Sequence, residues 1–234
     1  MYTTYLQRKK YNMLIDFIAH FYAPYLCVGC GTEGKALICP TCAENIPRIP
    51  PRCFRCKQVS RGYRTCEACR RRSSLHQVLA FAPYAEEVKL GIRALKYERA
   101  QGVAKQFTSF LGELTGELDG SYVLVPAPTA THRVRQRGYD QAELIAKRLA
   151  HQQKTLFSVA LARRGRAHQV GADRAQRMRQ VKGAFWVRRP RDIKGKHVVL
   201  VDDIITTGAT LEEAARALKR AGAQRVSAIV VAQA

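Results

Sequence analysis

The stretch VVLVDDIITTGAT, residues 198–210, limits the folds open to this chain more than any other segment. Its Val and Leu residues follow one another without alternation, as in a strand that is covered on both faces within a parallel sheet. Asp202 and Asp203 end the apolar run, and a short loop rich in Thr then leads into a helical pattern. This order of strand, loop and helix predicts an α/β fold that binds ligands beyond the carboxyl ends of its strands.

The loop after the two acids has the features of a phosphate site. Amides at a helix N-terminus lack partners within the helix and carry a positive partial charge, and a glycine lets an oxygen approach the backbone. No Walker pattern with its lysine precedes the helix. Two adjacent carboxylates repel each other unless hydroxyl groups or a cation such as Mg²⁺ lie between them, so we expect a ribose 5-phosphate here. The residues expected to hold it are Asp202, Asp203, Thr206, Thr207, Gly208, Ala209 and Thr210.

The rest of the chain beyond residue 72 alternates between strand and helix patterns. We expect strands at residues 76–84, 122–128, 157–162, 183–187, 197–203 and 225–233. We expect helices at residues 85–97, 103–114, 140–150 and 209–223. The alternation predicts a mainly parallel sheet.

All eight cysteines stand in four Cys-x-x-Cys pairs, and we expect them to bind two structural Zn²⁺ ions. Disulfides would need an export route that the sequence does not show, a redox pair would need a βαβ context, and an iron–sulfur cluster is the remaining competitor. Neighbouring or interleaved pairs could share an ion. The segment has few apolar residues, so metal binding, worth about 10–16 kcal/mol in such modules, would supply its folding energy. The ligands are Cys27, Cys30, Cys39, Cys42, Cys53, Cys56, Cys66 and Cys69.

The net charge of +22 is concentrated in two stretches. Residues 48–72 hold nine Lys or Arg and one Glu, and residues 133–191 hold sixteen Lys or Arg and three acids, which gives +8 and +13. Such concentrations attract polyanions, because binding releases counterions. Arg52, Arg55 and Arg61 lie between the cysteine pairs and are expected to contact a nucleic-acid backbone, although a purely structural ribbon remains an alternative.

The chain shows no apolar run of about eighteen residues, so we expect no membrane span and a cytoplasmic location. The run Met13–Leu26 is broken by Asp16 and His20 and has no cleavage pattern of a signal peptide. A helix that packs on a neighbour, or one that lies on a membrane surface, would account for it. The expected division is a helical segment at 1–26, a double zinc module at 27–72 and an α/β domain at 73–234.

The segment VVLVDDIITTGAT closely resembles the 5-phosphoribosyl-1-diphosphate (PRPP) motif of type I phosphoribosyltransferases. The wider layout resembles the competence protein ComF family, of the ComFC/GntX type. Three further segments carry this second likeness: LKY, VPAPTATHRVRQRGYDQAEL and HQVGADRAQRMRQVKGAF. Together with the cysteine-rich N-terminus, the likeness covers nearly the whole chain.

The resemblance implies a type I phosphoribosyltransferase-like fold with a zinc module, PRPP bound with Mg²⁺, and a role in DNA uptake and natural transformation. Single-stranded DNA and a competence or replication helicase are the partners it implies. The turn after residue 126 would face the diphosphate, and residues 163–179 resemble a mobile hood. The residues implied at the mouth of the site are Pro128, Thr129, Arg133, Arg135, Arg137 and Gly138.

One departure from the family of purine-base transferases leaves catalysis open. Those enzymes have an Asp as proton acceptor where this chain has Thr206, so a purine-salvage role is not expected. No catalytic residue can be named, although His132 and His168 are near the expected mouth, and Tyr97 and Tyr139 could stack on a base. A phosphoribosyltransferase with an unknown acceptor and a non-catalytic module that binds single-stranded DNA are both compatible with the sequence.

Overall fold

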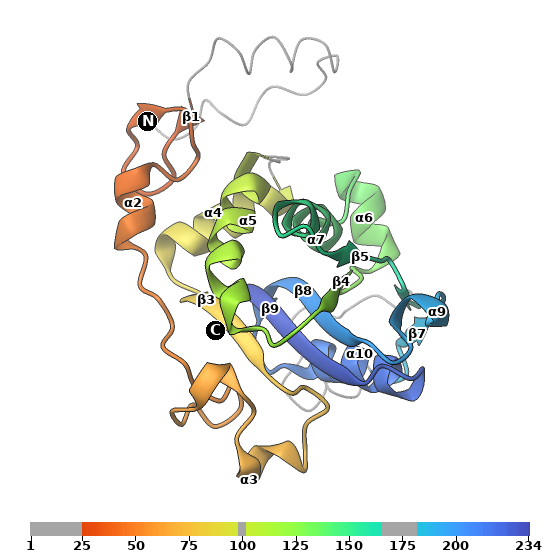
Figure 1. Ribbon diagram of the computed structural model, residues 1–234. Coiled ribbons are helices and arrows are strands. Elements are labelled where there is room, and N and C mark those ends of the chain that lie inside the picture. The colour runs from red at the N-terminus through yellow and green to blue at the C-terminus, as the bar shows by residue number, and fades with distance from the viewer. Residues whose placement is uncertain (1–24, 98–101, 165–181) are drawn as a thin grey trace.

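The computed structural model describes residues 25–97, 102–164 and 182–234. Five parallel strands form its main sheet in the order β3-β9-β8-β4-β5, which confirms the predicted α/β class (Figure 1). The strands are β3 (Val78–Pro83), β4 (Tyr122–Pro126), β5 (Leu156–Phe157), β8 (His197–Ile205) and β9 (Arg225–Gln233).

Strand β8 lies at the centre of the sheet, between β4 and β9. Its apolar run from Val198 to Val201 is fully buried, as its lack of alternation predicts. The last paired residue of β4 is Pro126, which lies opposite Val201. The two acids that follow Val201 therefore stand beyond the end of β4, at the carboxyl edge of the sheet.

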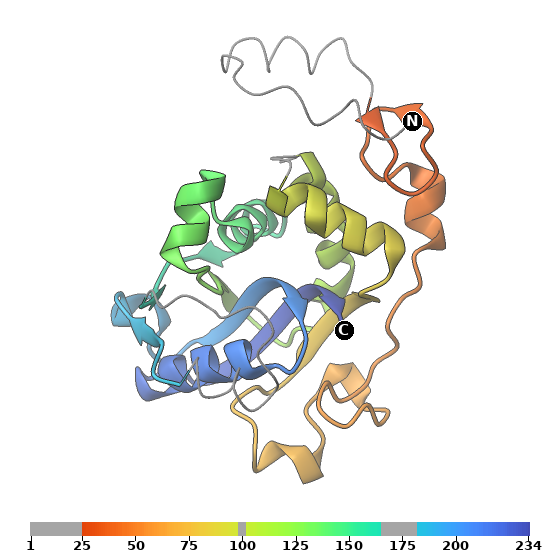
Figure 2. The ribbon, with the colours of Figure 1, turned by 180° about the vertical axis from the view of Figure 1, so that it is seen from behind.

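Helices cover both faces of the sheet, as right-handed crossovers between parallel strands require. Helices α5 and α7 pack against each other on one face, together with α4, whereas α10 lies on the other face (Figures 1 and 2). Phe107 and Leu111 of α5 are fully buried in this packing. The bounds are α4 (Glu86–Tyr97), α5 (Gly102–Leu114), η2 (Thr115–Glu117), α7 (Gln141–Gln152) and α10 (Ala209–Arg220).

A small antiparallel pair stands apart from the main sheet. It is formed by β6 (Leu161–Arg163) and β7 (Phe185–Val187), and α9 (Pro190–Ile193) follows it. The sequence predicted one strand over 157–162, but the structure divides it, because Phe157 pairs with β4 whereas Leu161 pairs with β7. Strand β7 also packs against α10.

The cysteine-rich segment shares the core of the sheet. Ile38, Ile49 and Phe54 are buried in the same hydrophobic cluster as the strands, so packing against the sheet helps to hold this segment. Its elements are β1 (Tyr25–Leu26), β2 (Glu33–Gly34), α2 (Pro40–Asn45), η1 (Arg61–Tyr63) and α3 (Glu67–Arg70).

Most of the predicted N-terminal helical segment, residues 1–24, lies outside the described part of the chain. None of the helices that the structure describes has the length and the apolar composition needed to cross a membrane.

Candidate functional site

The loop between β8 and α10 opens to solvent directly after the acid pair. Thr206 is exposed, Thr207, Ala209 and Thr210 are half-buried, and Gly208 is buried. Gly208 has a φ of +76°, a left-handed conformation that favours glycine, and it begins the 12-residue helix α10. The Thr207 hydroxyl accepts a hydrogen bond from the amide of Ala209 at 3.3 Å. All five loop residues predicted from the sequence thus stand together at a helix N-terminus, where an anion is favoured.

Asp203 is buried and forms an ion pair with Lys96, near the end of α4. Burial alone would lower the pKa of Lys96, but the charges of Asp203 and Asp202 outweigh it, and the pKa is raised. The ammonium group therefore balances one of the two adjacent carboxylates. No charge pattern in the sequence pointed to Lys96, although the segment LKY contains it.

Asp202 is half-buried and has a different environment. Its Oδ1 accepts a hydrogen bond of 2.8 Å from the amide of Asp203. Burial, followed by the neighbouring charge of Asp203, raises its pKa well above the ordinary value, and Lys96 opposes this change only in part. A ligand that brings hydroxyl groups or a cation to Asp202 would relieve this cost of ionisation.

Two arginines from other elements lie near the acid pair. Burial, followed by the charge of Arg133, lowers the pKa of Arg163, and the charge of Asp202 opposes this change. The Arg163 guanidinium lies 5.5 Å from the ring centre of Phe185. Arg163 was predicted only as the first residue of a hood at 163–179, and residues 165–179 of that hood lie outside the described part of the chain.

The turn after β4 is fixed to its neighbours. The amide of Ala127 donates to the carbonyl of Val201 at 2.9 Å, and the amide of Thr129 donates to Asp140 at 2.8 Å. Asp140 also caps α7, where it accepts from the amide of Ala142 at 3.0 Å. The predicted mouth residues Pro128 and Thr129 are therefore held beside the end of β8.

The basic segment after this turn forms helix α6 (Thr131–Arg137) and ends at Gly138, which has a φ of +87°. The Arg137 guanidinium lies 5.2 Å from the ring centre of Tyr97, and its charge also reaches Lys96. The charge of Arg133 acts on Arg163, as described above. Arg135 is exposed, and no interaction among the described residues joins it to the acids.

The residues considered for catalysis are not gathered at the acids. His132 is exposed on α6, and His168 lies outside the described residues. The Tyr139 hydroxyl donates a hydrogen bond to the carbonyl of Leu95, so this ring has a structural contact with α4. Tyr97 is 70% exposed, and its ring remains accessible beside Arg137.

The eight cysteines form two groups that could each hold a metal ion, and the pairing is sequential. Cys27, Cys30, Cys39 and Cys42 form the first cluster, and Cys53, Cys56, Cys66 and Cys69 form the second. All sulfur atoms of a group lie within 4.8 Å of one another. The sulfur atoms of Cys30 and Cys39 are 3.7 Å apart, and those of Cys56 and Cys66 are 3.5 Å apart. A tetrahedral zinc site with bonds of about 2.3 Å requires about 3.8 Å between sulfurs, so both groups fit.

The thiols of each cluster are unequal before a metal binds. The side chain and amide of Thr32 lower the pKa of Cys30 to about 6. Burial would raise the pKa of Cys53, but hydrogen bonds from the backbone outweigh burial and lower it to about 6. Hydrogen bonding with Cys39 raises the pKa of Cys42 to about 12, and burial raises that of Cys69 to about 12. A cation would favour the thiolates and release protons on binding.

The second cluster packs directly beneath the β8–α10 loop. Phe54, between two of its cysteines, is buried with its Cε2 atom 3.0 Å from the place where a Cβ would stand on Gly208. The neighbouring Arg55 forms an ion pair of 3.0 Å with Glu212 in the first turn of α10. Glu212 also accepts from the Ser73 hydroxyl at 2.6 Å. Patterns along the sequence gave no signal for these contacts between distant segments.

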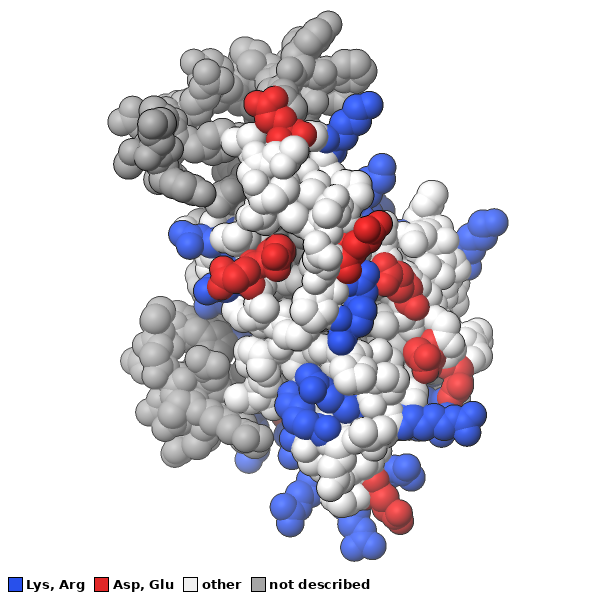
Figure 3. Space-filling model, turned by 90° about the vertical axis from the view of Figure 1, so that its left-hand side faces the viewer, with Lys and Arg blue, Asp and Glu red and all other residues white. Residues whose placement is uncertain are grey.

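The three arginines predicted to contact nucleic acid have different environments. Arg61 is exposed, and Arg52 is half-buried in a strand bridge with Val59. Arg55 is engaged with Glu212. Lys and Arg side chains gather toward the end of the molecule that carries α3 (Figure 3).

Comparison with known proteins agrees with this geometry. Residues 97–234 match the family model of the phosphoribosyl transferase domain. The DNA utilization protein YhgH of Escherichia coli O157:H7 is 28% identical over 84% of this chain and 88% of its own length. Competence protein ComFC of Bacillus subtilis is 27% identical over 79% of each chain, and competence protein F of Haemophilus influenzae is 24% identical over 86% of this chain and 94% of its own. The chain therefore belongs to the phosphoribosyl transferase domain family and, with these relatives, to the ComF family.

Proposed function

We propose that this chain is a PRPP-binding ComF protein that acts in DNA uptake, as the names of its relatives suggest. The observation that carries the proposal is the position of Asp202 and Asp203 directly before an open loop at the N-terminus of α10. The loop Thr206–Thr210 would hold the 5-phosphate, and Asp202 would bind the ribose hydroxyls, close to Mg²⁺. Lys96 would keep Asp203 ionised and in place.

The basic residues at the mouth suit the diphosphate of PRPP. The charge of Asp202 acts on Arg163, that of Arg133 also acts on Arg163, and that of Arg137 acts on Lys96. Arginine binds phosphate oxygens with a planar pair of donors. If the chain is an enzyme, these groups would neutralise the charge that develops on the diphosphate as it leaves the ribose.

An assay of diphosphate release decides between an enzyme and a binding module. Protein with PRPP and Mg²⁺ is incubated with a panel of nucleobases, amines and single-stranded DNA. Turnover with any of these acceptors identifies a phosphoribosyltransferase and names its acceptor. PRPP binding without release across the whole panel favours the module. Because Thr206 cannot accept a proton from a base, we expect the purine bases to give no turnover.

We propose Zn²⁺ as the ion of both cysteine clusters, since four thiolates at tetrahedral spacing are its usual structural ligands. Metal analysis of the purified protein would then find two Zn²⁺ per chain. A Cys56→Ser variant would hold one zinc, and an iron–sulfur chromophore would contradict the assignment.

A second candidate is a non-catalytic protein that holds single-stranded DNA beside a competence or replication helicase. The charge of +22 and the gathering of Lys and Arg near α3 favour it (Figure 3). Both candidates act on DNA, but only an enzyme would release diphosphate from PRPP. Replacement of Arg52 and Arg61 by Ala tests the cluster face directly, because Arg55 is needed by Glu212.

A further inference from the structure

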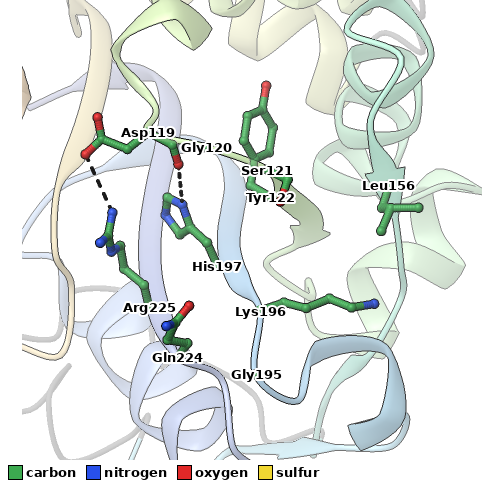
Figure 4. Close-up of a pocket in the computed structure, with 10 residues that line it drawn as sticks. All are labelled: Asp119, Gly120, Ser121, Tyr122, Leu156, Gly195, Lys196, His197, Gln224 and Arg225. Atoms are coloured by element: carbon green, nitrogen blue, oxygen red, sulfur yellow. Dashed lines mark hydrogen bonds and ion pairs between the residues drawn. The ribbon is translucent and has the colours of Figure 1, made fainter.

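A cavity of about 470 Å³ lies at the amino ends of the strands, the edge of the sheet opposite to the acid pair (Figure 4). Tyr122 begins β4, His197 begins β8 directly after Lys196, and Arg225 begins β9. Strand β8 has nine residues, so about 26 Å separates this edge from the other at about 3.3 Å per residue. The volume lies within the range of about 300–1,000 Å³ found for sites that bind small groups.

The cavity combines fixed polar groups with apolar surface. His197 is buried, and its Nε2 lies 2.8 Å from the hydroxyl of Ser227, while its Nδ1 lies 3.4 Å from the carbonyl of Asp119. The ring of Tyr122 meets His197 edge-on, with 6.4 Å between the ring centres. Leu156 is 58% exposed on the rim. Aromatic and aliphatic surface next to fixed polar atoms suits a flat ring with polar edges, such as a nucleobase.

Cations gather at this edge in the last turn of α10, in the loops before β5 and β8, and at the start of β9. The exposed or half-buried ones are Lys154, Lys194, Lys196, Lys219, Arg220 and Arg225. Among the residues that line the cavity, Asp119 is the acid, and it already pairs with Arg64 at 3.1 Å and with Arg225 at 3.6 Å. The edge therefore has an excess of positive charge, which suits phosphates. Arg64 belongs to the second cluster, so this charge continues toward α3.

The environment of His76 agrees with a positive potential here. Burial, followed by the charges of Arg225 and Arg64, lowers its pKa to about 4. A proton is disfavoured on His76 partly because cations surround it, and the same field favours an anion.

We propose that the cavity and the six cations named above, together the amino-edge surface, bind single-stranded DNA. One base enters the cavity, and the neighbouring phosphates bind the lysines. Single strands are favoured over duplexes because only an unpaired base is free to leave its stack. The proposal rests on the DNA-binding part of the proposed function. It goes further because it places DNA and PRPP at opposite edges of the sheet, where both are bound at once.

Fluorescence anisotropy with a labelled oligothymidylate of about twenty nucleotides tests this surface. The variant Lys194→Glu with Lys196→Glu is compared with Lys89→Glu and Arg93→Glu on α4, which reverses two exposed cations outside the cavity lining. We expect the first variant to lose at least tenfold in affinity, with a log–log salt dependence shallower by about 1.4 for two lost phosphate contacts. The α4 variant should keep its affinity within about twofold, because its two cations lie outside the amino-edge surface. Equal losses in both variants would overturn the proposal.

Two further measurements separate the parts of the proposal. Ser121→Ile fills the cavity without changing charge, so affinity should fall several-fold while the salt dependence stays the same. Unchanged affinity would show that no base enters the cavity.

Saturating PRPP with Mg²⁺ should leave DNA affinity unchanged, and displacement of DNA by PRPP would place both ligands at the carboxyl edge and overturn the proposal. If the unmodified protein binds no oligonucleotide, both the inference and the DNA role fail, whereas DNA binding that ignores Lys194 and Lys196 leaves that role intact.

Discussion

The ring of Phe54 lies 3.0 Å from the point where a side chain on Gly208 would begin. Phe54 belongs to the second cysteine cluster, and Gly208 belongs to the loop that we propose for the 5-phosphate. The contact joins the proposed metal site to the proposed phosphate site, from segments more than 150 residues apart in the chain. Arg55 and Glu212 add an ion pair to the same interface. The cluster therefore supports the floor of the loop.

Gly208→Ala should weaken both folding and PRPP binding. The added methyl group meets Phe54, and the φ of +76° alone costs a residue with a Cβ about 1–2 kcal/mol. Urea unfolding and PRPP titration measure the two effects. Gly116→Ala is the matched control, because nothing lies within 4 Å of its added Cβ and its φ is not positive. Equal stability of the two variants would contradict the proposed contact.

Phe54→Leu should reduce PRPP affinity several-fold while both metal ions stay bound. The smaller side chain leaves a gap beneath Gly208, and loop positions depend on such packing. Val59→Ala, in the same cluster segment but 93% exposed, should behave as the unmodified protein does. Calorimetry with PRPP and metal analysis of the same samples check this. An affinity that is unchanged in Phe54→Leu would show that the cluster does not support the loop.

Lys96→Met should lower the free energy of unfolding by about 3 kcal/mol, because it leaves the buried carboxylate of Asp203 without its partner. Adding Asp203→Asn to this variant should recover much of the loss, since the amide carries no charge. The double variant should still bind PRPP poorly, because a carboxylate of the site is missing. Chemical denaturation of the four proteins gives the coupling energy, and a coupling near zero would argue against the ion pair.

His76→Gln should make stability less sensitive to acid. The folded protein holds the pKa of His76 at about 4, below its ordinary value of 6.5, so the unfolded state binds a proton first as the pH falls. Stability is therefore lost between about pH 6.5 and pH 4 in the unmodified protein. The difference in unfolding free energy between the two proteins isolates this effect, because metal loss at low pH affects both alike. Parallel pH curves would contradict the low pKa.

The sequence predicted the parts of the fold that follow from local patterns. The continuous apolar run Val198–Val201 is the centre of the sheet, and the acids after it stand at its carboxyl edge. Asp140 was expected in the first turn of a helix, and it caps α7. These features depend on neighbours in the chain, which a sequence shows directly.

Contacts between distant segments could not be predicted in this way. Lys96 and Asp203 are more than 100 residues apart, and no pattern in either segment pairs them. The spacing of the cysteines was compatible with both sequential and interleaved pairing, and the positions of the sulfur atoms show the sequential arrangement. Arg55 was expected to face nucleic acid because it is basic and lies in a loop, but its environment is set by Glu212, far along the chain.

The central claim is that the acid pair and the loop after it bind PRPP, and calorimetric titration of PRPP in the presence of Mg²⁺ tests it most directly. The account predicts saturable binding that a magnesium chelator weakens and that Asp202→Asn reduces at least tenfold, whereas Asp119→Asn, an exposed acid at the opposite edge, leaves it unchanged. No binding by the unmodified protein, or equal binding by the Asp202→Asn variant, would contradict it.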